Sequence, residues 1–162
     1  MKKRISLVCV LMLAVSLLAG CGSGSGGSGE KKSKEPEPFT LGEYTYKLGP
    51  IARNTEEDTD SEEAYTVTLL IEGDSAPVII SGGVTKAGVE VTLVSGDDTY
   101  NYTVAGFKAL TEEEKEGEFG ASAEFTFKIP KGTDFPEKAI VNDGSNPEEK
   151  TELDLSGVEI KE

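Results

Sequence analysis

The sequence contains no histidine and no tryptophan, and both of its cysteines lie within the first 21 of its 162 residues. The body of the chain therefore has no cysteine for a disulfide, and Cys/His zinc sites are excluded. A serine or threonine nucleophile would have no histidine as its base, and neither the SxxK nor the GxSxG spacing occurs within residues 39–162. These absences predict a protein that is not an enzyme.

Acidic residues outnumber basic ones by 30 to 16, which gives a formal net charge of −14. A surface of this charge repels nucleic-acid phosphates and anionic lipid, so we expect no nucleic-acid partner. Nothing in the sequence singles out two of these carboxylates as the pair that glycoside hydrolysis requires, and there is no tryptophan to hold a sugar ring beside them.

Residues 1–20 have the order of a targeting segment. A basic start (residues 2–4) precedes an apolar run over residues 5–20. As a helix this run would measure about 24 Å, short of the ~30 Å hydrocarbon core of a bilayer. We therefore predict a cleaved signal peptide, which also removes Cys9. Because three basic residues and no acidic residues leave with it, the formal charge changes from −14 to −17.

The four residues Leu18, Ala19, Gly20 and Cys21 resemble the lipobox of bacterial lipoproteins, and the basic start and apolar run precede them in the expected order. The resemblance implies that diacylglycerol is attached to the Cys21 thiol and that cleavage occurs just before it. Two or more acyl chains anchor a protein stably, so the implied location is the extracytoplasmic face of the cell membrane. The alternative is an ordinary secretory signal with an incidental cysteine.

Residues 21–38 form the predicted linker. Its first half is rich in glycine and serine, which gives a flexible coil, and its second half contains proline, glutamate and lysine, which is stiffer. Such a segment would hold a folded domain, residues 39–162, close to the membrane. A Gly/Ser-rich linker after the cysteine favours a Gram-positive cell membrane.

Short runs of alternating apolar and polar residues occupy the domain, and this period of two is typical of strands with one buried face. Turn clusters at Ser95–Asp98 and Asn142–Pro147 separate some of them. We predict an all-β, antiparallel, immunoglobulin-like sandwich of seven to eight strands, with a barrel as the alternative. The runs lie at residues 43–48, 65–71, 77–81, 89–94, 100–104, 121–129, 138–142 and 151–160.

Two further segments bear on the fold. Thr111 and Glu114 have the spacing of a helix capping box and Gly117 that of a stop signal, so we expect one or two helical turns within a loop. Residues 125–141 loosely resemble the closing strands of immunoglobulin-like domains in uncharacterised Gram-positive lipoproteins. That resemblance implies a fold and a location and no activity.

The acidic loop around Asp58, Asp60 and Glu62 is the candidate metal site. Its alternating carboxylates are similar to the start of an EF-hand calcium loop. The sequence then departs from the EF-hand pattern, because Glu63 stands where that pattern requires glycine and Leu69 stands where it requires glutamate. The sequence predicts either a calcium site that also uses backbone carbonyls or a solvated acidic loop.

The tyrosine pairs Tyr44/Tyr46 and Tyr100/Tyr102 suggest a second kind of site, an aromatic platform for a glycan. Each pair shares its face with an apolar residue, which is how core-facing residues look. The leading hypothesis is therefore a non-catalytic interaction or accessory module that meets a protein partner at the cell surface through an edge strand or a loop cluster. The alternative is a ligand-binding module for calcium or a glycan.

Overall fold

The computed structural model describes residues 37–75, 78–81 and 84–162. They belong to one unit of the chain, Lys32–Glu162, and the predicted signal peptide, Cys21 and nearly all of the predicted linker lie outside them. Regular structure in this part is β-strand apart from one 3-10 turn, η1 (Thr55–Glu57). The strands are β1 (Phe39–Leu41), β2 (Tyr44–Arg53), β3 (Glu62–Ile71), β4 (Val78–Ser81), β5 (Val84–Ala87), β6 (Val89–Ser95), β7 (Asp98–Asn101), β8 (Val104–Ala109), β9 (Ala121–Pro130), β10 (Lys138–Asp143), β11 (Lys150–Asp154) and β12 (Ile160–Lys161).

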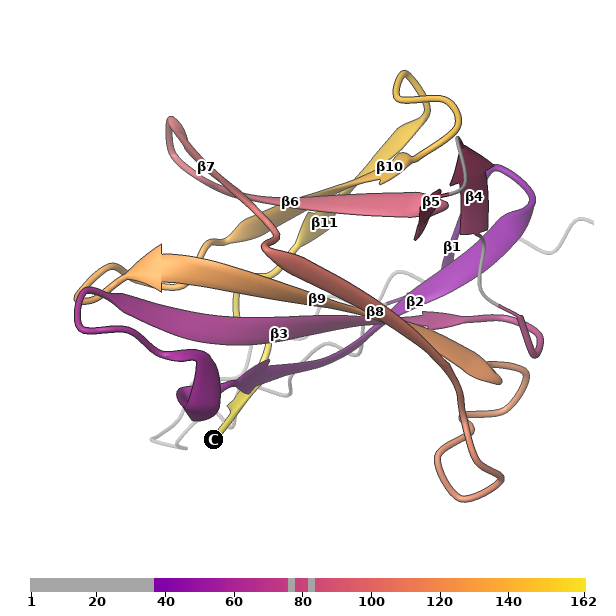
Figure 1. Cartoon of the computed structure of the whole chain (residues 1–162), viewed down its shortest axis with the longest axis horizontal. Coiled ribbons are helices and arrows are strands. Elements are labelled where there is room, and N and C mark those ends of the chain that lie inside the picture. Colours follow the sequence, from indigo (N-terminus) through magenta and orange to yellow (C-terminus); the bar gives the residue numbers. More distant parts are fainter. Residues whose placement is uncertain (1–36, 76–77, 82–83) are drawn as a thin grey trace, which may run out of the picture. The chain divides into compact units, whose positions relative to one another are not determined.

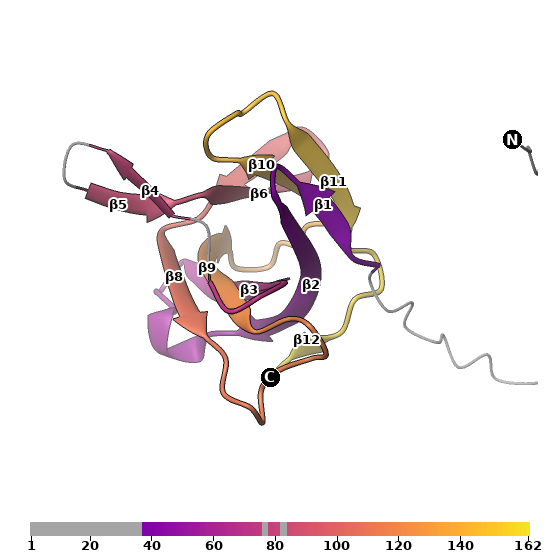
Figure 2. The same cartoon turned by 90° about the vertical axis from the view of Figure 1, so that its right-hand side faces the viewer.

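The strands form two facing sheets and a separate hairpin (Figure 1). The larger sheet has the order β1-β2-β3-β9-β8, and β12 pairs in parallel with β2. The smaller sheet, antiparallel throughout, has the order β11-β10-β6-β7. β4 and β5 pair with each other in the connection between the sheets, and their hairpin projects to one side (Figure 2). The predicted all-β sandwich is confirmed.

One hydrophobic core lies between the two sheets. Tyr46, Leu69 and Phe125 enter it from the larger sheet, and Val91 and Leu93 enter it from the smaller, all of them at most 1% exposed. These residues lie on the faces that the alternating pattern predicts to be buried. In the described part of the chain every fully buried member of the core belongs to the compact unit Lys32–Glu162, and we expect this unit to fold by itself.

The two predicted turns are also present. In the first, Ser95 pairs with Asp98 across a two-residue turn, and Gly96 has a φ of +58°. This left-handed conformation is the one that a hairpin turn of this length requires and that glycine adopts without strain. In the second, the Asp143 carboxylate accepts the Ser145 N–H at 2.6 Å, an arrangement typical of turns that begin with aspartate.

The prediction of a single strand over residues 100–104 is wrong. β7 ends in the smaller sheet and β8 begins in the larger one, so the chain crosses between the sheets near Tyr102. The Tyr102 ring keeps its contact with the core, 5.2 Å from the Phe125 ring between centroids. Val104, which the alternation places on the buried face, is instead 59% exposed.

Two other expectations need correction. Residues 151–160 form two strands, β11 and β12, which belong to different sheets. Together with the division at Tyr102 and the additional strands β1 and β5, this gives 12 strands instead of seven or eight. The expected helical turns are a single non-helical turn, in which the Glu114 carboxylate accepts the Thr111 N–H at 2.9 Å as in a capping box.

Candidate functional site

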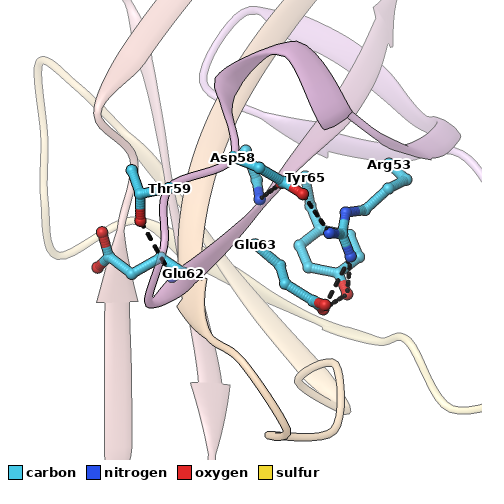
Figure 3. Close-up of polar contacts among 7 residues, drawn as sticks. Arg53, Asp58, Thr59, Glu62, Glu63 and Tyr65 are labelled. Carbon is cyan, nitrogen blue, oxygen red and sulfur yellow. Dashed lines mark hydrogen bonds and ion pairs between the residues drawn. The ribbon is translucent and has the colours of Figure 1, made fainter.

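Arg53, the last residue of β2, holds the acidic loop against the end of the β2–β3 hairpin (Figure 3). One guanidinium nitrogen donates to Asp58 at 2.5 Å, and another pairs with Glu63 at 2.8 Å. The guanidinium carbon lies 5.1 Å from the centroid of the Tyr65 ring, within the range of a cation–π contact. The Tyr65 hydroxyl donates to Glu63 at 2.8 Å, which closes the cluster.

The backbone of the loop is ordered by the same residues. The second Asp58 oxygen accepts the Ala64 N–H at 2.8 Å, and the Ala64 carbonyl accepts the Asn54 N–H at 2.8 Å. The Thr59 hydroxyl accepts the Glu62 N–H at 3.0 Å, and the Glu62 carbonyl accepts the Thr59 N–H at the same distance. Hydrogen bonds therefore order the backbone of the loop, although Glu56, Glu57, Thr59 and Asp60 are exposed to solvent.

These contacts shift the titration of the cluster. The Arg53 guanidinium, followed by the Ala64 N–H, lowers the pKa of Asp58. The hydrogen bond from the Tyr65 hydroxyl, with a smaller contribution from Arg53, lowers the pKa of Glu63. The pKa of Tyr65 is raised, mainly by the burial of its hydroxyl. The cluster therefore keeps both carboxylates ionised to a lower pH than isolated carboxyl groups.

The structure does not bring the three predicted calcium ligands to one point. Both Asp58 oxygens are engaged within the chain, Asp60 is exposed, and the Glu62 side chain points away from the Arg53 cluster (Figure 3). Across the described ranges, no three acidic or cysteine side chains gather in a group that could hold a metal ion. Calcium binding stays a prediction, and the cation that the structure places against Asp58 is Arg53.

The tyrosines of the suggested glycan platform pack inward. Tyr46 is 1% exposed, and Tyr44, Tyr100 and Tyr102 are half-buried against the core. The Tyr44 and Tyr46 rings lie 6.3 Å apart between centroids. Their positions fit the core-facing alternative, and the glycan hypothesis gains no support from them.

A groove crosses the outer face of the larger sheet, the face that does not contact the core. Leu70 of β3 pairs with Ser122 of β9, which pairs with Lys108 of β8. In the next row Thr68 pairs with Glu124. The floor of the groove is formed by these two rows, with Pro50 at the bulge of β2, and the rim by Leu110, Glu114 and Glu116 of the β8–β9 loop; its volume is about 180 Å³.

The β8–β9 loop is fastened over one end of the groove. The Gly73 N–H donates to the Glu118 carbonyl at 2.9 Å, and the Gly120 N–H donates to the Gly73 carbonyl at 3.0 Å. Glu116 forms an ion pair with Lys47 of β2 at 3.1 Å. The loop therefore reaches across the sheet to β2 and the end of β3, and it forms a fixed wall.

Ion pairs order the charged rim. Lys108 lies 3.2 Å from Glu114 and 3.6 Å from Glu124. The Thr111 N–H, followed by Lys108, lowers the pKa of Glu114 to about 2. Glu114 and Glu124 raise the pKa of Lys108 in turn. Glu114 and Lys108 are therefore both charged at neutral pH.

Ser122 lies at the floor of this groove with no exposed surface, and its hydroxyl has no hydrogen-bond partner among the described residues. An unpaired buried hydroxyl costs about 1–3 kcal/mol. Sequence reasoning missed this position. The available signal was Leu70, which interrupts the alternation in "TLLI" and is 5% exposed although it lies on the outer face.

β8 is the open edge of the larger sheet. It pairs with β9 and, in the described part of the chain, with no other strand. The Leu110 N–H donates to the Gly120 carbonyl at 2.8 Å, and bonded positions alternate along an antiparallel strand. The peptide groups of Ala105, Phe107 and Ala109 therefore face away from β9, and they are free to pair with an added strand.

β8 is also the least protected of the edge strands in the two facing sheets, as far as their described residues show. Proteins commonly shield such edges with charges or keep them very short. The exposed side chains of β11 are charged, β7 has four residues, and β1 and β12 are shorter still. β8 has six residues and one charge, Lys108, and Val104 at its start is a large exposed apolar side chain.

Comparison of the chain with models of protein families, with curated proteins and with solved structures gave no match. Within residues 37–162, leaving aside the segments not described, there is no helix long and apolar enough to cross a membrane. Any assignment of function therefore depends on the sequence of the first 38 residues and on the geometry of the sandwich.

Proposed function

We propose that this protein is a lipid-anchored, extracytoplasmic accessory protein whose β-sandwich binds a protein partner at the membrane surface without catalysis. The open edge of β8 carries this proposal, because its outward peptide groups offer a template for an extended segment of the partner. Addition of a strand to a sheet edge takes its affinity from main-chain hydrogen bonds and its specificity from neighbouring side chains.

The proposed anchor and the start of the folded domain lie at compatible positions in the sequence. The lipobox-like residues 18–21 would place the lipid on Cys21, and the first strand of the sandwich starts at Phe39, one residue after the predicted linker ends. A flexible segment of about 17 residues has an r.m.s. span of roughly 20–25 Å. This distance keeps the domain near the bilayer while leaving β8 accessible to a neighbouring membrane protein.

The strand order supports an immunoglobulin-like sandwich. Naming β2, β3, β6, β7, β8, β9, β10 and β11 in sequence as A, B, C, C′, D, E, F and G gives sheets A-B-E-D and C′-C-F-G. Immunoglobulin sandwiches have the same order. Domains of this type serve many unrelated functions, so the order supports the fold and leaves the function to the exposed edge.

The experiment tests the anchor and the edge together in intact bacterial cells. A photo-crosslinking amino acid replaces Val104 in the full-length chain, and a matched control carries it at Glu152, an exposed position on β11. We expect a crosslinked adduct in the membrane fraction from position 104 and none from position 152. The Cys21→Ser change should abolish both fatty-acid labelling and the adduct, whereas Cys9→Ser should change neither.

The two parts of the proposal fail separately in this experiment. Unchanged labelling and membrane fractionation in the Cys21→Ser protein would contradict the anchor. Equal adducts from positions 104 and 152, or none from either in correctly anchored protein, would contradict the use of β8.

A further inference from the structure

The unpaired hydroxyl of Ser122 marks the groove beside β8 as unusual. Among the residues whose side chains the structure describes, Ser122 is the one polar residue with no exposed surface. Its cross-strand neighbours are Leu70 and Lys108, and neither forms a hydrogen bond with the hydroxyl. Because this oxygen is buried, a polar group of a ligand would meet it only when the flanking side chains of Leu70 and Lys108 move apart.

The charges of the groove select the sign of such a ligand. Glu114, Glu116 and Glu124 line it with one lysine, Lys108. Even when Lys47, the partner of Glu116, is included, the set carries an excess of one negative charge. The chain as a whole is strongly acidic, so an anionic ligand would be repelled both locally and at long range.

We propose that this groove binds an alkylammonium group, the chemistry shared by a lysine side chain and a free primary amine. The ammonium group lies between the Ser122 hydroxyl, which accepts a hydrogen bond from it, and the Glu124 carboxylate, which pairs with its charge. These residues are two apart on β9 and share a face, about 7 Å apart along the strand. The alkyl stem lies over Leu70 and Pro50.

Glu124 is the carboxylate best placed for this role. Glu114 already accepts hydrogen bonds from the Thr111 N–H at 2.9 Å and the Thr111 hydroxyl at 3.0 Å, as well as from Lys108. The contact between Glu124 and Lys108 is the longer one, at 3.6 Å. Opposite Glu124 on β8 is Gly106, where even a Cβ would meet nothing within 4 Å. No side chain therefore stands directly opposite Glu124 on β8, and Lys108 is its neighbour there.

The size of the groove fits a short chain. Its volume of about 180 Å³ is similar to the roughly 150 Å³ of an engineered protein cavity that holds benzene. This space suits an ammonium group with a stem of a few methylenes. The inference does not depend on strand addition to β8, because a free amine can enter whether or not a partner uses that edge.

The test is an NMR titration of the 32–162 fragment at low salt with pentylamine, 1-pentanol and pentanoate, which have the same chain length and differ in charge. We expect pentylamine to shift the backbone amide signals of Leu70, Ser122 and Glu124, and the other two compounds to leave them nearly unchanged. Equal shifts with all three compounds, or none with pentylamine up to tens of millimolar, would overturn the proposal.

Three variants and one matched control test the assigned residues. Glu124→Gln should weaken pentylamine binding about tenfold and Ser122→Ala about fivefold. Lys108→Met should strengthen it severalfold, because it frees the carboxylates from a competing ammonium group. Glu152→Gln, which removes a lysine-paired carboxylate on the other sheet, should have no effect. If Lys108→Met instead abolishes binding, the groove is an anion site and the proposal is wrong.

A second arm distinguishes the source of the ammonium group. The titrant is a short blocked peptide with threonine and valine on either side of one lysine. Tighter binding than pentylamine, with shifts at Ala105, Phe107 and Ala109, assigns the groove to a lysine on an added strand. Equal affinity with no shift in β8 assigns it to a small amine. Both results support an alkylammonium site. The control peptide has norleucine in place of lysine. If the lysine peptide binds more weakly than this control, the alkylammonium site is contradicted.

Discussion

Arg53 shows that a run of acidic residues can be paired with a cation of the chain itself. In the sequence, Asp58, Asp60 and Glu62 suggest a metal loop, because carboxylates in alternation are typical of calcium ligands. In the structure, the guanidinium contacts Asp58 and Glu63. The planar, multiply donating guanidinium is well suited to two carboxylates at once. The same sequence pattern fits either kind of cation, and spacing alone does not choose between them.

The acid sensitivity of the protein should depend on Arg53. Asp58 and Glu63 both have lowered pKa values in the folded state. A carboxyl group of this kind contributes stability above its unfolded pKa, near 4, and the contribution is lost as the pH falls through its lower folded pKa. We expect Arg53→Met to lower the free energy of unfolding at pH 7 and to flatten its decline between about pH 5 and pH 2.

The measurement is urea unfolding of the 32–162 fragment at a series of pH values, followed by far-UV circular dichroism. Lys138→Met, which breaks an exposed ion pair with Glu152, is the matched control, and it should change stability little. The difference between wild type and Arg53→Met should be greatest at pH 7 and smallest at low pH. Parallel curves of unfolding free energy against pH for the two proteins would show that Arg53 does not lower the pKa values of Asp58 and Glu63.

At the scale of elements, period-two alternation was sufficient to predict which side of most strands is buried. It predicted the inward positions of β2, β3, β6 and β9, because the side chains of a half-buried strand face the core at every second residue. It could not show that residues 100–104 leave one sheet and join another. Tyr102 still packs on Phe125 after the crossover, so the apolar pattern continues while the backbone changes partners.

The groove was not predictable for a different reason. Ser122 and Glu124 are ordinary outward residues of a strand in the sequence, and they gain their significance from the β8–β9 loop that returns over them. This return depends on hydrogen bonds between Gly73 and residues 118–120. Contacts between segments this far apart in the sequence leave no local pattern.

Gly120 lets the β8–β9 loop pass close to the backbone at Gly73, and its substitution should open the loop. A Cβ at Gly120 would lie 2.5 Å from an Asp74 oxygen and 2.8 Å from the Gly73 carbonyl oxygen, which is part of the backbone and cannot rotate away. Gly120→Ala should therefore cost about 1–3 kcal/mol of stability. Gly106→Ala, with nothing within 4 Å, is the matched control and should cost less.

Urea unfolding measures both costs, and NMR shifts at Asp74 and Glu118 report whether the loop has moved. If Gly120→Ala is no less stable than Gly106→Ala, the close approach of the two backbones is not a constraint on the loop.

At the scale of the whole molecule, the two sheets depend on one core. Phe125 and Leu69 of the larger sheet and Val91 of the smaller belong to the same buried cluster, and the 32–162 unit has no disulfide to hold either sheet alone. A domain with a shared core unfolds as one cooperative unit.

Cooperative unfolding gives the last prediction, which concerns the 32–162 fragment. Phe125→Ala removes a fully buried ring and should cost about 3–5 kcal/mol, a large part of the 5–15 kcal/mol typical of a domain. Val104→Ala, at an exposed site, should stay within about 0.5 kcal/mol of wild type. Because both sheets share the core, NMR signals of Val67 in β3 and Val91 in β6 should disappear at one urea concentration, lower in Phe125→Ala for both. If only the Val67 signal shifted, each sheet would have to be stabilised separately, and strand addition at β8 would then be expected to stabilise the larger sheet alone.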